Sequence, residues 1–145
     1  MNLLHTSVFL FCGSFIINYF ITTSLFLDSI HHFRNNLNRF YLALYKSLWM
    51  LVISCGIFLF FNHQFHPIFL FTIASLILTV FFLARYQVGV NEKQYVNSLI
   101  QVHSDTLLTS KAAYKKAKNP EVKQLAKSIY ERNEKIIEKL IKLSK

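Results

Sequence analysis

The sequence predicts an all-α membrane protein in which three transmembrane helices precede a water-soluble hairpin of two helices. The first reason is the distribution of charge: residues 1–84 contain four charged side chains and a net charge of +2, whereas residues 85–145 carry +7. The second reason is that apolar residues form unbroken runs in the first part and recur at helical spacing in the second. This division excludes both a single soluble domain and a disordered chain.

Three apolar runs are the predicted spans, at residues 7–27, 41–61 and 67–84. The first run has 21 residues without a charge, and a helix of that length crosses a bilayer core of about 30 Å. It lacks the basic start and the cleavage site of a signal peptide, so we expect it to be retained. Residues 1–86 are therefore predicted to form a membrane domain, with residues 28–40 and the C-terminal segment on the same side of the bilayer.

Lys46 lies near the start of the second span, beside Tyr41, Tyr45 and Trp49. Aromatic side chains and snorkelling lysines are typical of the membrane–water interface, so plain anchoring is the favoured interpretation of Lys46. Lys and Arg also gather in the connection after the first span and in the C-terminal segment. By the positive-inside rule, this bias favours the cytoplasmic side for the C-terminal segment.

Residues 91–145 are predicted to form the helical hairpin. Asn91 followed by Gln94 has the pattern of a helix cap, and Asn119 followed by Pro120 predicts a second helix start after a turn. Apolar positions alternate at spacings of four and three residues in both helices, which predicts a seam between them. The seam residues that we single out are Ile100, Leu107, Ile129, Asn133, Ile136 and Leu140.

One apolar stripe on each of two helices makes a small core, so the hairpin is expected to need a partner surface. A second copy of the chain is the simplest partner, since it would complete a four-helix bundle about a two-fold axis. Packing against the chain's own membrane part is the alternative. The lysines are interleaved with glutamates and no nucleic-acid motif is present, so we expect contact with lipid headgroups and none with nucleic acid.

Signatures of an enzyme are absent from the sequence. Its three glycines do not form a phosphate-binding loop, and no nucleophile motif surrounds a Ser, Thr or His. Six of the seven acidic residues fall in the hairpin without an arranged acid–base pair. We therefore expect a non-catalytic protein.

Four short segments of the hairpin have a recognisable pattern: KQY at residues 93–95, LIQVHS at 99–104, LTSK at 108–111 and NPEVKQLA at 119–126. Together they resemble the family called domain of unknown function (DUF) 305. The stretch NRFY at residues 38–41 is similar to the start of the second span in the membrane-anchored members, which have three N-terminal spans. The resemblance covers most of the chain and implies that the hairpin is a ferritin-like half bundle.

Some members of that family bind copper, and the family's signature is a Met-Ile-Pro-His-His run with further methionines, since soft thioethers and imidazoles suit Cu(I). Here Leu99, Gln101 and Val102 stand at the first Met, the Pro and the first His of the run, and only His103 is kept. The resemblance therefore implies a non-catalytic accessory in copper handling whose ligand set is degraded. We expect this chain to bind copper weakly or not at all, with His103 as the candidate ligand.

His103 has two interpretations. In the first, two copies of the chain bring their His103 side chains together at a dimer axis and form a weak metal site. In the second, His103 is a seam histidine that is hydrogen-bonded to Asn133 or Ser110. The second interpretation goes with a different function, that of a structural or interaction module: a membrane-anchored bundle that oligomerises or docks a partner without metal.

Two histidine pairs are further metal candidates, because histidines at short spacing can share one metal. They are His31–His32, in the connection after the first span, and His63–His66, in the loop between the second and third spans. Interfacial histidines are also common without metal. A role in envelope metal handling would favour the outer side for the hairpin, in conflict with the charge bias, so the sequence leaves the membrane side open.

Overall fold

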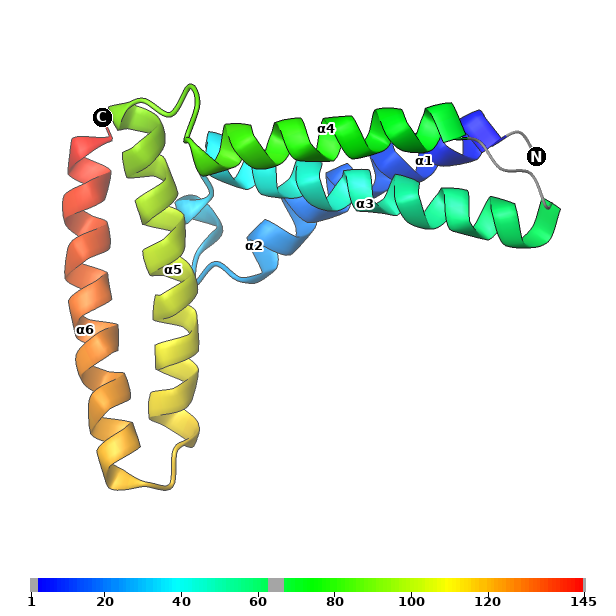
Figure 1. Ribbon diagram of the computed structural model, residues 1–145. Coiled ribbons are helices and arrows are strands. Elements are labelled where there is room, and N and C mark those ends of the chain that lie inside the picture. Colours follow the sequence, from blue (N-terminus) through cyan, green and yellow to red (C-terminus); the bar gives the residue numbers. More distant parts are fainter. Residues whose placement is uncertain (1–2, 63–66, 145) are drawn as a thin grey trace. The chain divides into compact units, whose positions relative to one another are not determined.

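The computed structural model describes residues 3–62 and 67–144, and all of the regular elements in these ranges are helices (Figure 1). This confirms the predicted all-α class. In chain order the elements are α1 (Leu3–Ile16), a π-helical stretch (Ile17–Thr22), α2 (Thr23–Leu25), a 3₁₀ turn (Ile30–His32), α3 (Leu37–Asn62), α4 (Pro67–Arg85), α5 (Glu92–Lys116) and α6 (Pro120–Leu143).

The chain folds as two compact units. The membrane unit comprises Met1–Thr22 and Asn38–Gly89, and the hairpin unit comprises Thr23–Leu37 and Val90–Lys145. We call residues 26–36, which link α2 to α3, the connection. The membrane domain predicted from sequence, residues 1–86, includes the connection, whereas the structure groups the connection with the hairpin.

Three helical segments are long and apolar enough to cross a membrane, namely Leu4–Leu25, Leu37–Phe61 and Pro67–Arg85. They correspond to the three predicted spans. The first predicted span, residues 7–27, extends too far, because the helix ends at Leu25 and Leu27 is buried in the hairpin unit. An apolar residue at the end of a run can be buried in protein as well as in lipid, and composition alone does not distinguish the two.

Small polar side chains connect α1 with α3 in the membrane unit. The Oγ atoms of Ser7 and Ser54 lie 3.1 Å apart. The Ser47 hydroxyl donates a hydrogen bond of 2.8 Å to the Ala43 carbonyl within α3 and lies 3.4 Å from the Ser14 hydroxyl on α1. Ser7, Ser47 and Ser54 are buried. Because small residues let helix backbones approach closely in a membrane, these serines position α1 against α3.

The N-terminal part of α3 is tied to the chain that follows α4. The Tyr41 hydroxyl donates a hydrogen bond of 2.7 Å to the Val88 carbonyl. Gly89 has a φ of 74°, a left-handed conformation that glycine adopts without strain, so the chain can turn sharply after α4. α3 and α4 run antiparallel, side by side (Figure 1).

α5 and α6 form an antiparallel hairpin with the two caps that the sequence predicts. The Asn91 side chain accepts a hydrogen bond of 2.9 Å from the Gln94 amide. The Asn119 side chain accepts one of 2.8 Å from the Glu121 amide, and Pro120 is the first residue of α6. These caps satisfy N–H groups that have no partner within their own helix.

The two helices of the hairpin pack along an apolar seam. Of the predicted seam residues, the structure buries Ile100, Leu107, Asn133 and Leu140 and half-buries Ile129 and Ile136. Ile137 is buried next to the half-buried Ile136. Ile137 is eleven residues after the buried Ala126, close to three full turns of about 3.6 residues, so it points to the same side of α6.

Candidate functional site

A row of polar side chains is buried on one face of α5. Asn97, Gln101 and Ser104 follow one another at spacings of four and three residues, so they lie on one side of the helix. Gln101 and Ser104 have no measurable exposure to solvent. Burying an amide or a hydroxyl is costly unless it is hydrogen-bonded, so this row needs partners, and the connection supplies them.

Gln101 is the centre of this interface. Its Nε2 donates a hydrogen bond of 2.8 Å to the Arg34 carbonyl, and its Oε1 accepts a hydrogen bond from Nδ2 of the buried Asn36. Both ends of the side-chain amide are therefore used by the connection. An amide held at both ends fixes the position of the connection along α5 as well as its distance from the helix.

Two further contacts extend the interface toward the N-terminus of α5. Asn97 Nδ2 donates a hydrogen bond of 3.3 Å to the Asn35 carbonyl. Gln94 Oε1 accepts one of 2.9 Å from the backbone amide of Leu37, the first residue of α3. An N–H at this position has no carbonyl partner within its own helix, so Gln94 supplies the missing acceptor.

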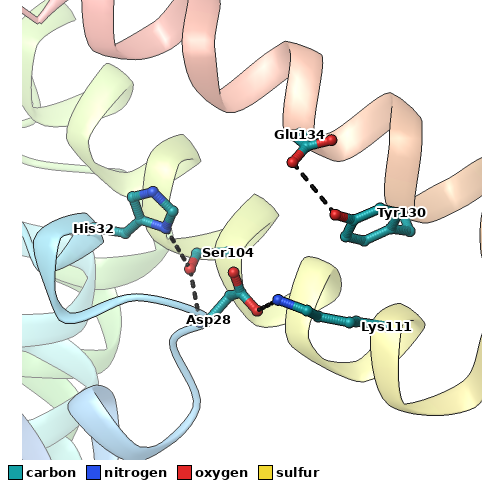
Figure 2. A network of polar contacts seen from close by, with 6 residues as sticks. All are labelled: Asp28, His32, Ser104, Lys111, Tyr130 and Glu134. Carbon is teal, nitrogen blue, oxygen red and sulfur yellow. Dashed lines mark hydrogen bonds and ion pairs between the residues drawn. The ribbon is translucent and has the colours of Figure 1, made fainter. Parts of the chain in front are cut away.

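At the other end of the interface, Ser104 joins two residues of the connection (Figure 2). Its Oγ accepts a hydrogen bond of 3.0 Å from the Asp28 amide and lies 2.9 Å from Nδ1 of His32. Burial lowers the pKa of His32 below its ordinary value of 6.5, although the carboxylate of Asp28 opposes this shift. The interface therefore favours a neutral His32.

An ion pair closes this end of the interface. Lys111 Nζ on α5 lies 3.2 Å from Asp28 Oδ1, and this hydrogen bond raises the pKa of Lys111. On α6, the Tyr130 hydroxyl donates a hydrogen bond of 3.3 Å to Glu134, whose negative charge also favours the charged form of Lys111 (Figure 2). Lys111 is thus paired with Asp28 of the connection and is also under the electrostatic influence of Glu134 on α6.

His103, the candidate metal ligand, has the structural environment of a seam histidine. Its Nδ1 lies 2.6 Å from Asn133 Oδ1, and Asn133 Nδ2 donates a hydrogen bond of 2.9 Å to the Ile129 carbonyl. The second bond orients the amide so that its oxygen faces the imidazole, which assigns the proton to Nδ1 and the lone pair to Nε2.

The other donor groups do not gather into a copper site. Within residues 3–62 and 67–144, no group of three or more His, Cys, Asp or Glu side chains is placed to hold a metal ion. His31 is exposed and His32 contacts Ser104, so this pair is divided between solvent and the interface. The pair His63–His66 lies outside the described residues. The donors that the structure describes therefore do not fit a closed Cu(I) site.

Sequence reasoning did not find the interface between the connection and α5. Asn97, Gln101 and Ser104 are polar residues beside an apolar stripe, a pattern that a solvated helix face shares. A signal was nevertheless present, since these three residues recur at helical spacing without a Lys or Glu among them. The connection also contains two adjacent Asn residues, Asn35 and Asn36, which suit hydrogen bonds to backbone and amide groups.

Comparison with known proteins adds a relative to this description. No family model matches the chain, and no solved structure matches it. The chain is similar to "Uncharacterized protein L153" of Acanthamoeba polyphaga mimivirus, with 32% identity over 117 residues. The match covers 81% of this chain and 76% of the viral protein, so it takes in residues from both units. The chain therefore belongs to the same family as protein L153.

Proposed function

We propose that this protein is a non-catalytic, membrane-anchored interaction module, whose hairpin unit presents a helical surface to a partner. The observation that carries the proposal is that the connection covers only one side of the hairpin. The connection hydrogen-bonds to one face of α5, through Asn97, Gln101 and Ser104, and leaves apolar side chains elsewhere on the hairpin exposed.

The exposed apolar side chains lie along the other edge of the hairpin. On α6, Leu125 is 62% exposed and Leu143 is 73% exposed, and both share an edge with the half-buried Ile129 and Ile136. Tyr130 and Glu134 lie on the opposite edge, which faces Lys111 and the connection. Apolar residues grouped along one edge of a charged helix are typical of a protein contact surface.

A second copy of the chain is the partner that this edge supports first. Two hairpins that bury these edges against each other make a four-helix bundle about a two-fold axis. The proposal is in keeping with the resemblance to DUF 305, under which the chain is a divergent relative that keeps a ferritin-like half bundle without the copper ligands.

The test measures the oligomeric state of the full chain in lipid nanodiscs by single-molecule photobleaching. The full chain is required because the connection is part of the hairpin unit, so an excised hairpin would lack it. We expect dimers for the natural sequence, monomers for a Leu125→Ser, Leu143→Ser double variant, and dimers for the control Gln124→Ser, an exposed polar neighbour. Monomers at every density of the natural sequence would overturn self-association as the function.

Copper handling is the second candidate, and one observation favours it. A ligating histidine commonly donates its second N–H to an oxygen, and His103 has this arrangement through Asn133. In the dimer, two such side chains supply two nitrogen ligands, which suits weak binding only. Titration with Cu(I) of the full chain and of its His103→Ala variant distinguishes the two functions. Copper handling predicts that the variant loses Cu(I) binding, whereas an interaction module predicts that the variant still associates with its partner.

A further inference from the structure

An apolar groove runs between α3 and α4 in the membrane unit. Its volume is about 630 Å³, which is within the range of roughly 300–1,000 Å³ that is usual for ligand sites. α3 contributes Tyr45 and Trp49 to the lining, and α4 contributes Leu70, Ala74, Leu78 and Phe81. Such a surface fits a hydrocarbon chain.

Two cations lie at one end of this groove. Lys46 is exposed and directly follows the lining residue Tyr45. It leaves α3 about 100° around the helix from Tyr45, so its long, flexible side chain has to bend toward the end of the groove. Arg85, also exposed, comes one turn after Phe81, on the face of α4 that carries Ala74, Leu78 and Phe81 at spacings of four and three. α3 and α4 are antiparallel, and the Tyr41–Val88 hydrogen bond sets their register, so Lys46 and Arg85 come to the same end.

The membrane unit offers these cations no anionic partner. Its sequence contains no Asp or Glu, because all seven acidic residues of the chain lie at position 28 or between positions 92 and 138. Neither Lys46 nor Arg85 makes a hydrogen bond or an ion pair with a residue that the structure describes. The counter-charge for this pair therefore has to come from outside the unit.

Tyr45 and Trp49 give the depth of this end of the groove. Tyrosine and tryptophan concentrate at the level of the lipid headgroups, where Lys and Arg side chains also reach the phosphates. Arginine binds phosphate oxygens in pairs, and lysine adds a point charge. The groove thus combines an apolar slot with two cations at the depth of a phosphate.

We propose that this groove binds one anionic phospholipid, with an acyl chain along α3 and α4 and the headgroup phosphate held by Lys46 and Arg85. Plain anchoring of the two cations at the bilayer surface makes a different prediction. Anchoring needs no defined stoichiometry, and it does not distinguish a lipid-facing side chain in the groove from one beside it.

The chain contains a matched pair of residues for this test. Phe81 and Phe82 are adjacent on α4 and are 48% and 51% exposed, but only Phe81 lines the groove. The full chain is purified in a mild detergent, and native mass spectrometry counts bound dioleoyl phosphatidylglycerol or dioleoyl phosphatidylcholine. We expect one phosphatidylglycerol per chain, bound at least about tenfold more tightly than phosphatidylcholine, which corresponds to about 1.4 kcal/mol.

The variants separate the acyl slot from the phosphate contact. We expect Phe81→Ala and the double variant Lys46→Gln, Arg85→Gln each to weaken this binding about tenfold or more, whereas Phe82→Ala and the charge control Lys118→Gln, in the hairpin unit, leave it unchanged. Added inorganic phosphate should not displace the lipid, because it cannot occupy the apolar slot. Circular dichroism checks that each variant folds. If the charge variant does not fold, the comparison of Phe81→Ala with Phe82→Ala still tests the proposal. Equal effects of Phe81→Ala and Phe82→Ala, equal affinity for the two lipids, or binding without a one-lipid plateau would each overturn the proposal.

Discussion

The membrane unit and the hairpin unit both bury polar side chains, but they satisfy them in different ways. In the membrane unit the buried groups are small serines: Ser47 hydrogen-bonds to the Ala43 carbonyl of its own helix, and the hydroxyls of Ser7 and Ser54 meet between α1 and α3. In the hairpin unit the buried Gln101 hydrogen-bonds to the connection, more than sixty residues away in sequence. Ser47 can therefore satisfy its hydroxyl within one helix, whereas Gln101 is satisfied only when a distant part of the chain is in place.

The largest difference that we expect concerns the apolar seam of the hairpin unit. Ile137→Ala removes a buried side chain and should destabilise the unit by roughly 2–5 kcal/mol. The neighbouring change Ile136→Ala removes a half-buried side chain and should cost clearly less. Both losses of stability can be measured by urea unfolding of the full chain in nanodiscs, with hydrogen exchange of the α5 and α6 amides as the readout. Equal losses would show that the two residues contribute equally to the seam.

The second expected difference compares the two ways of burying a polar group. Gln101→Leu removes the hydrogen bonds that Gln101 makes with the Arg34 carbonyl and with the Asn36 side chain, and a buried polar group that loses such a bond costs roughly 1–3 kcal/mol. Ser47→Ala in the membrane unit should cost only about 1 kcal/mol, because it removes one short bond within α3 and one long contact of 3.4 Å with the Ser14 hydroxyl on α1.

Hydrogen exchange measures the outcome of Gln101→Leu locally. The amides of the connection should lose protection in this variant, while those of α3 and α4 keep theirs. An unchanged connection would mean that its backbone is held by something other than Gln101.

The features that sequence could predict are those that depend on neighbouring residues. The three apolar runs, the caps at Asn91 and Asn119, and the hairpin itself follow from composition and from helical spacing. The burial of Ile137 could also have been obtained, since a period of about 3.6 residues favours it over the strict seven-residue repeat that selects Ile136.

The interface between the connection and α5 could not be predicted in the same way. Whether Gln101 faces water or Asn36 depends on a contact between distant segments, and residues with this chemistry are compatible with either. The same ambiguity affected Leu27, which composition assigns to the first span and the structure buries in the hairpin unit. His103 is a third case, because its hydrogen bond to Asn133 depends on how α5 and α6 are aligned.

A smaller effect is expected from pH, and only in the hairpin unit. His32 has a lowered pKa when the connection is docked, so the detached connection takes up a proton more readily than the docked one. Docking should therefore be fully stable above the ordinary pKa of about 6.5 and weaken as the pH falls below it. The groups that face His32 are Asp28, which opposes the shift, and Arg34 and His31, which reinforce it.

Protection factors of the connection amides at pH 7.5 and pH 5.5 test this dependence. In a His32→Gln variant the side-chain amide can still hydrogen-bond to Ser104 but does not titrate in this range. Its protection should therefore be nearly independent of pH. A natural sequence with the same protection at both values would show that His32 does not contribute to docking through its charge.

The smallest effect is expected from the ion pair between Lys111 and Asp28. The Lys111 side chain is 43% exposed, and that of Asp28 is 16% exposed, so water and salt screen their attraction. Lys111→Gln should slightly lower the protection of the connection at low ionic strength, and raising the salt concentration should remove the difference from the natural sequence. Lys115→Gln, an exposed lysine one turn further along α5, is the matched control and should have no effect at either salt concentration. If the loss of protection in Lys111→Gln persisted at high salt, the alkyl chain of Lys111 would be holding the connection by packing. The charge of Lys111 would then contribute little to the stability of the hairpin unit.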